Sequence, residues 1–267
     1  MPYLTVNGTQ LYYEDKGQGQ PVLFIHGLWC SCRFFDQQVD YFARRYRTLV
    51  FDLRGHGRST PIQSGHTMAN YARDVHELMQ QLELTETVLV GWSMGSFVIW
   101  DYFKQFGAEN VKATVFVDQS ASDFQWPDWP LGAFDFTGLC HWMANVQTDR
   151  AEAMREFVGL FFKGEPTAKD LRWILDEMTR IPASIAGAVL FAQSVEDYRA
   201  VLPTVNVPAL ICFGRHDKFF PLAAGEYLKQ NLPQAELVVF EQSGHCPFLE
   251  EAERFNQEVD RFLSSLS

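Results

Sequence analysis

Short runs of apolar residues, without regular polar alternation, recur at intervals along this chain. Such runs are typical of strands that are buried on both faces of a parallel sheet. They occupy residues 22–25, 48–51, 87–90, 113–117, 209–213 and 237–240. Two further segments, residues 4–6 and 11–14, flank Asn7-Gly8, which predicts an antiparallel hairpin. The pattern therefore predicts eight strands, most of them parallel.

Between these strands the apolar residues recur every three or four positions, as they do on one face of a helix. The clearest case is residues 68–82, where Met68, Tyr71, Val75 and Leu78 share a face. Further helices are expected near residues 34–43, 96–103, 222–230 and 251–263. Strands that alternate with helices predict an α/β fold with right-handed crossovers.

This alternation stops after Asp118. Residues 119–204 contain no buried-strand pattern but predict helices near residues 149–162, 168–179 and 184–194. Their first part, residues 122–130, is rich in proline and tryptophan and is expected to form a loop. We therefore predict a core domain of residues 1–118 and 205–267, with residues 119–204 inserted as a helical cap.

One pentapeptide, Gly91-Trp92-Ser93-Met94-Gly95, has the pattern of a nucleophile elbow. It follows one predicted strand and precedes a predicted helix. Glycine fits such a tight turn because it has no Cβ to clash with the neighbouring backbone. Ser93 would lie at the tip of the turn, with the N-terminus of the helix beside it. The sequence therefore predicts Ser93 as a nucleophile.

A serine hydroxyl needs a base, and the base needs an acid that fixes its tautomer. In elbow folds these residues follow the serine in the order acid, then histidine. Asp217 and His245 each come shortly after a predicted strand, so we expect them to be the acid and the base. Asp118, at the end of an earlier strand, is the alternative acid, and Asp123 is a third candidate.

Attack on a carbonyl group produces negative charge that backbone N–H groups can stabilise. One donor is expected to be Met94, directly after the nucleophile. The other should come from the loop after residues 22–25, where Leu28 is the first candidate and Trp29 the second. His26, in the same loop, is expected to be structural.

Several motifs together resemble those of the α/β-hydrolase superfamily, and they span nearly the whole chain. They are His26-Gly27, the turn Asp52-Leu53-Arg54-Gly55-His56-Gly57-Arg58-Ser59, Gly91 to Gly95, Gly214-Arg215-His216-Asp217 and Ser243-Gly244-His245. The branch that they resemble contains small bacterial carboxylesterases and cofactor-free haloperoxidases.

The resemblance implies an eight-stranded, mostly parallel sheet flanked by helices, with an inserted helical cap. It also implies ester hydrolysis by a Ser93–His245–Asp217 triad through an acyl-enzyme, with perhydrolysis as a side activity. Many members have histidine where this chain has Trp92, and glycine where it has Ser96. No cofactor or metal is expected, because the sequence has no phosphate-binding loop and no metal-ligand motif of known spacing.

Composition narrows the partners. Acidic residues outnumber basic ones, 33 to 22, and the formal net charge is −11, which disfavours nucleic acid and anionic membranes. The N-terminal residues lack the pattern of a signal peptide, and no apolar stretch is long enough to span a bilayer. Five widely spread cysteines favour free thiols and a cytoplasmic location. The sequence leaves homo-oligomerisation open.

Aromatic residues make up 15% of the chain and are frequent in the predicted cap. We therefore expect a small-molecule ester of small to medium size, bound among apolar side chains. The residues expected to line the pocket are Trp29, Trp92, Trp126, Phe134 and Trp142. Alternatives are hydrolysis of carbon–carbon bonds, lactones or amides, or a ligand receptor that retains a vestigial triad.

Overall fold

The computed structural model describes residues 3–266. Met1, Pro2 and Ser267 lie outside the described residues, so the first part of the signal-peptide prediction and the outer ends of the predicted core domain are not covered. Within residues 3–266, no helix is both long and apolar enough to cross a membrane.

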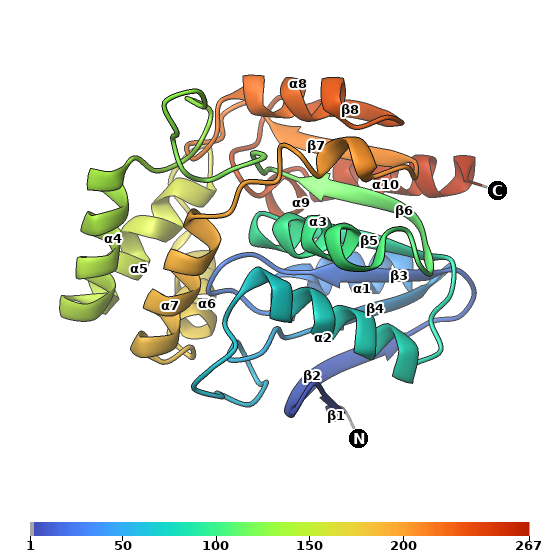
Figure 1. Cartoon of the computed structure of the whole chain (residues 1–267), viewed down its shortest axis with the longest axis horizontal. Helices are drawn as coiled ribbons and strands as arrows, with labels where there is room; N and C mark the ends of the chain where they lie inside the picture. The colour runs from blue at the N-terminus through green and yellow to red at the C-terminus, as the bar shows by residue number, and fades with distance from the viewer. Residues whose placement is uncertain (1–2, 267) are drawn as a thin grey trace.

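One eight-stranded sheet forms the centre of the described chain, in the order β1-β2-β4-β3-β5-β6-β7-β8 (Figure 1). The strands are β1 (Tyr3–Val6), β2 (Thr9–Lys16), β3 (Pro21–Ile25), β4 (Arg47–Phe51), β5 (Thr87–Trp92), β6 (Val111–Val117), β7 (Ala209–Gly214) and β8 (Ala235–Phe240). β1 pairs antiparallel with β2, and β2 with β4, whereas the other pairs are parallel. The predicted hairpin and the mostly parallel sheet are confirmed.

Helices cover both faces of this sheet. Figure 1 shows α2 and α3 in front of the sheet and α1 and α10 behind it. The core helices are α1 (Asp36–Phe42), α2 (Met68–Gln81), α3 (Met94–Phe106), α8 (Leu222–Asn231), α9 (Pro247–Glu250) and α10 (Ala252–Ser265), with 3₁₀ turns at Cys32–Phe35 and Leu202–Thr204. The helix predicted from residue 34 therefore begins as a 3₁₀ turn and becomes α-helical only at Asp36.

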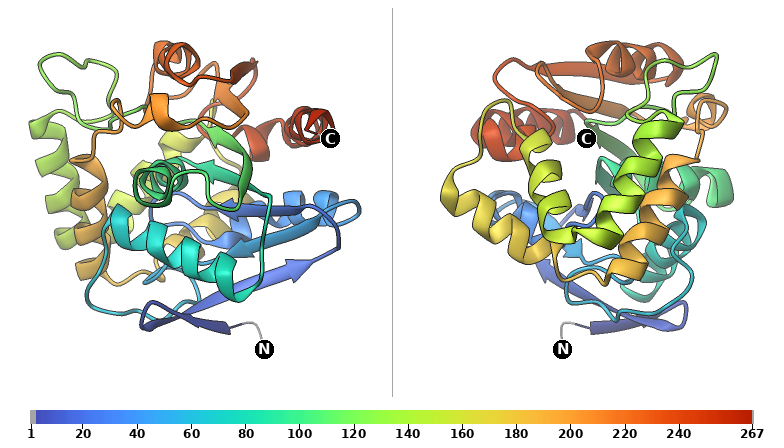
Figure 2. Two further views of the ribbon diagram at one scale, coloured as in Figure 1. Left: turned by 45° about the vertical axis from the view of Figure 1, so that its right-hand side comes forward. Right: turned by 90° about the vertical axis from the view of Figure 1, so that its left-hand side faces the viewer.

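The chain between β6 and β7 forms a helical cap beyond the carboxyl ends of the parallel strands, as Figure 2 shows from the side of the cap. Its helices are α4 (Phe136–Thr148), α5 (Arg150–Phe161), α6 (Ala168–Met178) and α7 (Ala183–Ser194). The sequence pattern predicted α5, α6 and α7 but not α4. Ligands of open α/β sheets bind at these strand ends, so the cap covers the expected site.

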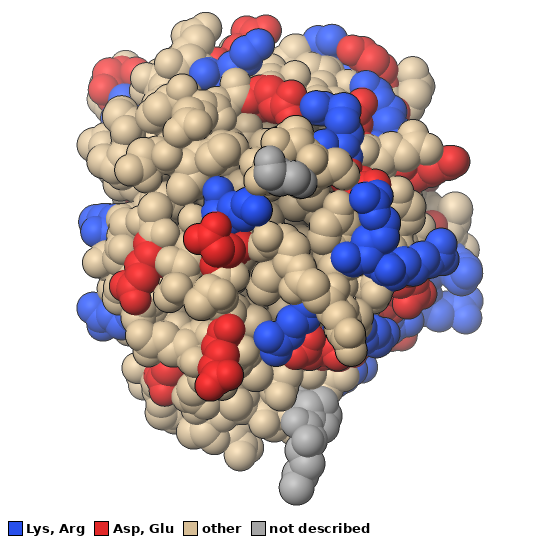
Figure 3. All heavy atoms as spheres, turned by 90° about the vertical axis from the view of Figure 1, so that its right-hand side faces the viewer, with Lys and Arg blue, Asp and Glu red and all other residues tan. Residues whose placement is uncertain are grey.

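The end of the molecule away from the cap carries both signs of charge, interspersed over its surface (Figure 3). Acidic side chains form ion pairs at the ends of the sheet strands, as in Arg47–Asp15 at 2.8 Å and Arg261–Glu236 at 3.0 Å. Exposed pairs of this kind contribute little to folding stability.

Candidate active site

Ser93 lies between β5 and α3 with a φ of 52° and a ψ of −123°. This strained conformation is typical of a turn at a functional site, and Ser93 is 8% exposed. A methyl group on Gly95 would overlap the backbone oxygen of Ile25, and a Cβ on Gly91 would come within 2.6 Å of the Gly95 backbone. Gly91 therefore allows β5 to turn tightly into α3, and Gly95 allows α3 to approach the end of β3.

The backbone of His245 is fixed from two sides. Its N–H donates to the carbonyl oxygen of Phe161 at the end of α5, over 2.9 Å. Its carbonyl oxygen accepts a hydrogen bond from Trp92 Nε1, also over 2.9 Å. The preceding residues are held by α9, since Glu250 accepts from Gly244 N at 2.6 Å. The residue before Ser93 and the last turn of a cap helix therefore both position this histidine.

His245 is 2% exposed, and its Nδ1 lies 3.0 Å from Asp217 Oδ2. The other oxygen of Asp217 accepts a hydrogen bond from Phe219 N at 2.8 Å. With Nδ1 directed at a carboxylate, Nε2 is the ring nitrogen that remains for exchanging a proton with a hydroxyl group. The structure brings together the predicted acid and the predicted base.

Asp118, the alternative acid, lies beside this pair. Its carboxyl oxygen Oδ1 accepts from Gly214 N at 2.8 Å, and its other side-chain neighbour is the carboxyl group of Asp217. Ligand atoms of Asp118, Asp217 and His245 lie within 4.8 Å of one another. Burial and the nearby charge of Asp217 raise the pKa of Asp118 well above its usual value. The neutral form of Asp118 is therefore favoured over its charged form.

Among the described residues, Asp118, Asp217 and His245 are also close enough together to hold a metal ion. However, His245 Nδ1 and Asp217 Oδ2 are the atoms that would bind such an ion, and they are hydrogen-bonded to each other. Burial also favours the neutral form of Asp118, which lowers the negative charge that this group offers to a divalent cation. The donor set fits a proton-sharing group better than a metal centre.

Ser93 and His245 line one narrow cavity of about 10 Å³ beneath the cap. Its other lining residues, apart from two polar ones, are apolar. The complete lining is Leu28, Ser93, Asp123, Ala133, Phe134, Phe157, Gln193, Phe219, Phe220 and His245. Met94, the other predicted oxyanion donor, is the first residue of α3, so its N–H has no acceptor within the helix.

Of the five residues expected to line the pocket, Phe134 is part of this lining, and the other four lie elsewhere. Trp29 packs on Phe157 and donates from Nε1 to the carbonyl of Ala186 in α7. Trp92 lies behind Ser93, against Phe34, Phe161 and Phe248. Trp126 donates to Ser122 Oγ within its own loop, and Trp142 packs on Phe157 from α4. Trp29 and Trp92 join the core to the cap, whereas Trp126 and Trp142 make these contacts within the cap, so the apolar surface of all four is used in packing.

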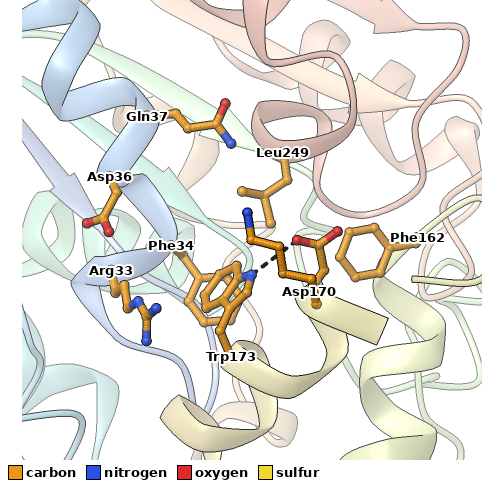
Figure 4. A pocket seen from close by; sticks show the side chains of 9 residues that line it. Arg33, Phe34, Asp36, Gln37, Phe162, Asp170, Trp173 and Leu249 are labelled. Atoms are coloured by element: carbon orange, nitrogen blue, oxygen red, sulfur yellow. Dashed lines mark hydrogen bonds between the residues drawn. The ribbon is translucent and has the colours of Figure 1, made fainter. Parts of the chain in front are cut away.

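A larger hollow of about 280 Å³ lies between α6 and the Cys32–Phe35 turn (Figure 4). Its lining includes Arg33, Asp36, Lys169 and Trp173 but neither Ser93 nor His245. Phe34 borders it and also stacks on Trp92 at 5.3 Å, so aromatic rings lie between this hollow and the elbow. The hollow therefore adds nothing to the chemistry around Ser93.

Other histidines near the elbow are structural. His26 is buried, contacts its neighbouring carbonyl through Nδ1, and accepts from Leu53 N at Nε2 over 3.0 Å. Burial lowers its pKa to about 4 and that of His56 to about 3. Both rings are neutral at pH 7, and His26 connects the Leu28 loop to the turn after β4.

Two polar residues of the cavity were not expected there. The sequence suggests Asp123 only as a third candidate acid for His245, and the structure instead places it in the cavity lining. Gln193 is not predictable from the sequence, because a glutamine near the end of a helix is usually exposed. It is 3% exposed and its amide contacts Asp123.

Comparison with known proteins extends over the sheet and the cap. A family model described as "Alpha/beta hydrolase family" matches residues 22–258. The Bacillus subtilis (strain 168) protein named "AB hydrolase superfamily protein YisY" is 30% identical over 259 residues, covering 96% of each chain. An esterase from Exiguobacterium antarcticum matches with a TM-score of 0.94 and 28% identity over 98% of each chain. A bromoperoxidase from Bacillus anthracis matches with a TM-score of 0.92 and 28% identity over 96% of each chain.

Proposed function

The chain belongs to the alpha/beta hydrolase family, and we propose that it hydrolyses carboxylic esters through an acyl-enzyme on Ser93. The observation that carries the proposal is the Asp217–His245 hydrogen bond beside a cavity that Ser93 and His245 both line. The similarity to an esterase of known structure supports the same reaction.

In the proposed reaction, His245 Nε2 accepts the proton of Ser93 Oγ as this oxygen attacks the ester carbonyl carbon. The Leu28 and Met94 N–H groups stabilise the resulting oxyanion, and Asp217 stabilises the imidazolium of His245. The ester C–O bond then breaks, and His245 returns the proton to the leaving alcohol. Water attacks the acyl-serine by the same route and releases the carboxylic acid.

The cavity favours a compact substrate. Its volume of about 10 Å³ lies far below the roughly 300–1,000 Å³ of common ligand sites, so even a small ester needs the lining side chains to move apart. Most of its lining is aliphatic or aromatic, which suits the apolar part of an acyl or alcohol group. We therefore propose small esters as substrates.

The bromoperoxidase similarity favours one side reaction. Hydrogen peroxide in place of water would attack the acyl-serine, and the product would then be a peracid instead of a carboxylic acid. The step needs no redox cofactor, because the peroxide supplies its own O–O bond.

Covalent labelling tests the proposed nucleophile directly. A fluorophosphonate is expected to add once per chain, on the peptide that contains Ser93, because only an activated serine reacts with it readily. Hydrolysis of p-nitrophenyl butyrate should fall in proportion to the labelled fraction, as measured by intact-mass and peptide mass spectrometry. Full turnover in completely labelled protein would contradict the proposal.

Trp92 is proposed as a positioning residue for His245. Replacing Trp92 by phenylalanine keeps a ring but removes the donor to the His245 carbonyl, and a buried unpaired carbonyl costs about 1–3 kcal/mol. We expect a lower melting temperature and a kcat about tenfold lower, with KM nearly unchanged, because the base is misplaced and the cavity is not.

The matched control is Trp100→Phe. Trp100 is fully buried in α3, and its Nε1 has no hydrogen-bond partner among the described residues. This variant makes the same change in ring size without removing a hydrogen bond. Equal losses of kcat in the two variants would show that packing alone, and not the bond to His245, explains the effect.

A further inference from the structure

Asp123 is a fully buried carboxylic acid in the wall of the proposed active site. It lies in the loop between β6 and α4, which crosses the carboxyl end of the sheet (Figure 1). Its carbonyl oxygen accepts from Phe134 N at 2.9 Å, and a Cβ on Gly132 would meet the same oxygen at 2.5 Å. The close packing of these two segments of the loop fixes the position of Asp123.

Gln193 approaches Asp123 from α7, on the other side of the cavity wall. Its amide nitrogen donates to Asp123 Oδ2. Gln193 Oε1 has no hydrogen-bond partner among the described residues, and Asp123 Oδ1 has only the nearby amide of Gln119. Buried acceptors without a partner are rare in folded proteins, and each one costs free energy. The hydrogen bonding of the Asp123–Gln193 pair is therefore incomplete in the protein alone.

No basic side chain compensates the acid. Burial raises the pKa of Asp123 to about 7, and only the amides of Gln193 and Gln119 act in the opposite direction. A buried carboxyl group without a cation would be replaced at little cost by an apolar residue if it served packing alone. Its place in the cavity instead suits contact with a bound molecule.

The rest of the cavity indicates which chemical group the bound molecule directs at Asp123. Ser93 and His245 lie in the same lining, and most of the remaining side chains are apolar. A group that contacts Asp123 must therefore belong to the ester that reacts at Ser93, since the cavity is too small for a second ligand. Gln193 Oε1 lacks a donor and Asp123 Oδ1 has only the Gln119 amide beside it, so this pair can accept a hydrogen bond from a bound molecule. A hydroxyl group fits better than an ammonium group, whose desolvation in an apolar cavity costs more.

We propose that Asp123 and Gln193 form a polar subsite that binds a hydroxyl group of the ester substrate. The preferred substrates are thus compact hydroxy esters, with the hydroxyl a few bonds from the scissile carbonyl. This inference rests on the proposed esterase function and adds the substrate class to it. It also changes the expectation of a purely apolar pocket.

The test compares matched esters on the full chain. Ethyl butyrate is paired with both enantiomers of ethyl 3-hydroxybutyrate and with 2-hydroxyethyl butyrate, and hydrolysis is followed by pH-stat. We expect kcat/KM to be about tenfold or more higher for at least one hydroxy ester, because a site with buried acceptors rejects an analogue that leaves them unpaired. In Asp123→Leu this ratio should fall to within about threefold of one.

Two further variants keep the test decisive. Gln193→Leu removes the second acceptor and should also lower the ratio if Asp123→Leu does not fold. Asp128→Leu, an exposed acid in the same loop that pairs with Arg199, should leave the ratio unchanged. Absence of hydrolysis of all the esters would overturn the proposed function. Hydrolysis with a ratio that Asp123 and Gln193 do not affect would overturn only the subsite, as would a clear preference for ethyl 3-aminobutyrate.

Discussion

Alanine in place of Ser93 is expected to lower kcat for p-nitrophenyl butyrate by about 10⁴-fold or more, leaving only the residual rate that binding and oxyanion stabilisation provide. The reason is chemical, because no other hydroxyl group shares the cavity with His245 among the described residues. The fold should persist, since alanine can take the same backbone conformation at a similar cost. Steady-state kinetics on active-site-titrated protein measures the effect, and thermal unfolding checks the fold.

Ser120→Ala is the matched control for this variant. Ser120 is buried beyond β6, and its hydroxyl has no hydrogen-bond partner among the described residues. Deleting that hydroxyl group should leave kcat unchanged to within about twofold. Turnover in Ser93→Ala at more than about one-hundredth of the original rate would assign the nucleophile to another group.

The central strands of the sheet were predictable because they are buried on both faces. Val88, Leu89 and Val90 in β5 are fully buried, and a run of that kind leaves little choice of structure. Helix α4 was missed because it carries no apolar stripe, with only Leu139 and Val146 buried. A local signal did exist, since Asp135 caps the helix by accepting from Gly138 N at 2.7 Å.

The reacting groups were easier to predict than their surroundings. The tight turn at Ser93 leaves a signature in consecutive residues, and His245 and Asp217 follow strands that are themselves recognisable. Contacts between distant segments leave no such signature. Gln193 and Asp123 are 70 residues apart in the chain, and their pairing depends on how α7 packs against the β6 loop. Trp126 and Trp142 were expected in the cavity lining but lie outside it, because composition does not distinguish a packed indole from one that lines a cavity.

The choice between Asp217 and Asp118 as the acid leads to the second large effect. Asp217→Asn is expected to lower kcat by about 10⁴-fold, because an amide facing His245 Nδ1 favours the wrong tautomer and no longer stabilises the imidazolium. Asp118→Asn should lower kcat by less than about tenfold, because burial and the nearby Asp217 already favour the neutral form of Asp118. An asparagine oxygen can still accept the hydrogen bond from Gly214 N.

Asp118→Asn thus tests the alternative hypothesis that Asp118 is the catalytic acid. It is also the matched control for Asp217→Asn, since the two acids lie side by side. If Asp118 were the ionised partner of His245, the order of the two losses would be reversed. Comparable large losses in both variants would instead indicate that the carboxyl groups act as one proton-sharing unit. The double variant distinguishes that case, because residues that act as a unit show a combined loss no greater than the larger single one. Separate roles predict that the two losses multiply, so that the small effect of Asp118→Asn persists in the Asp217→Asn background.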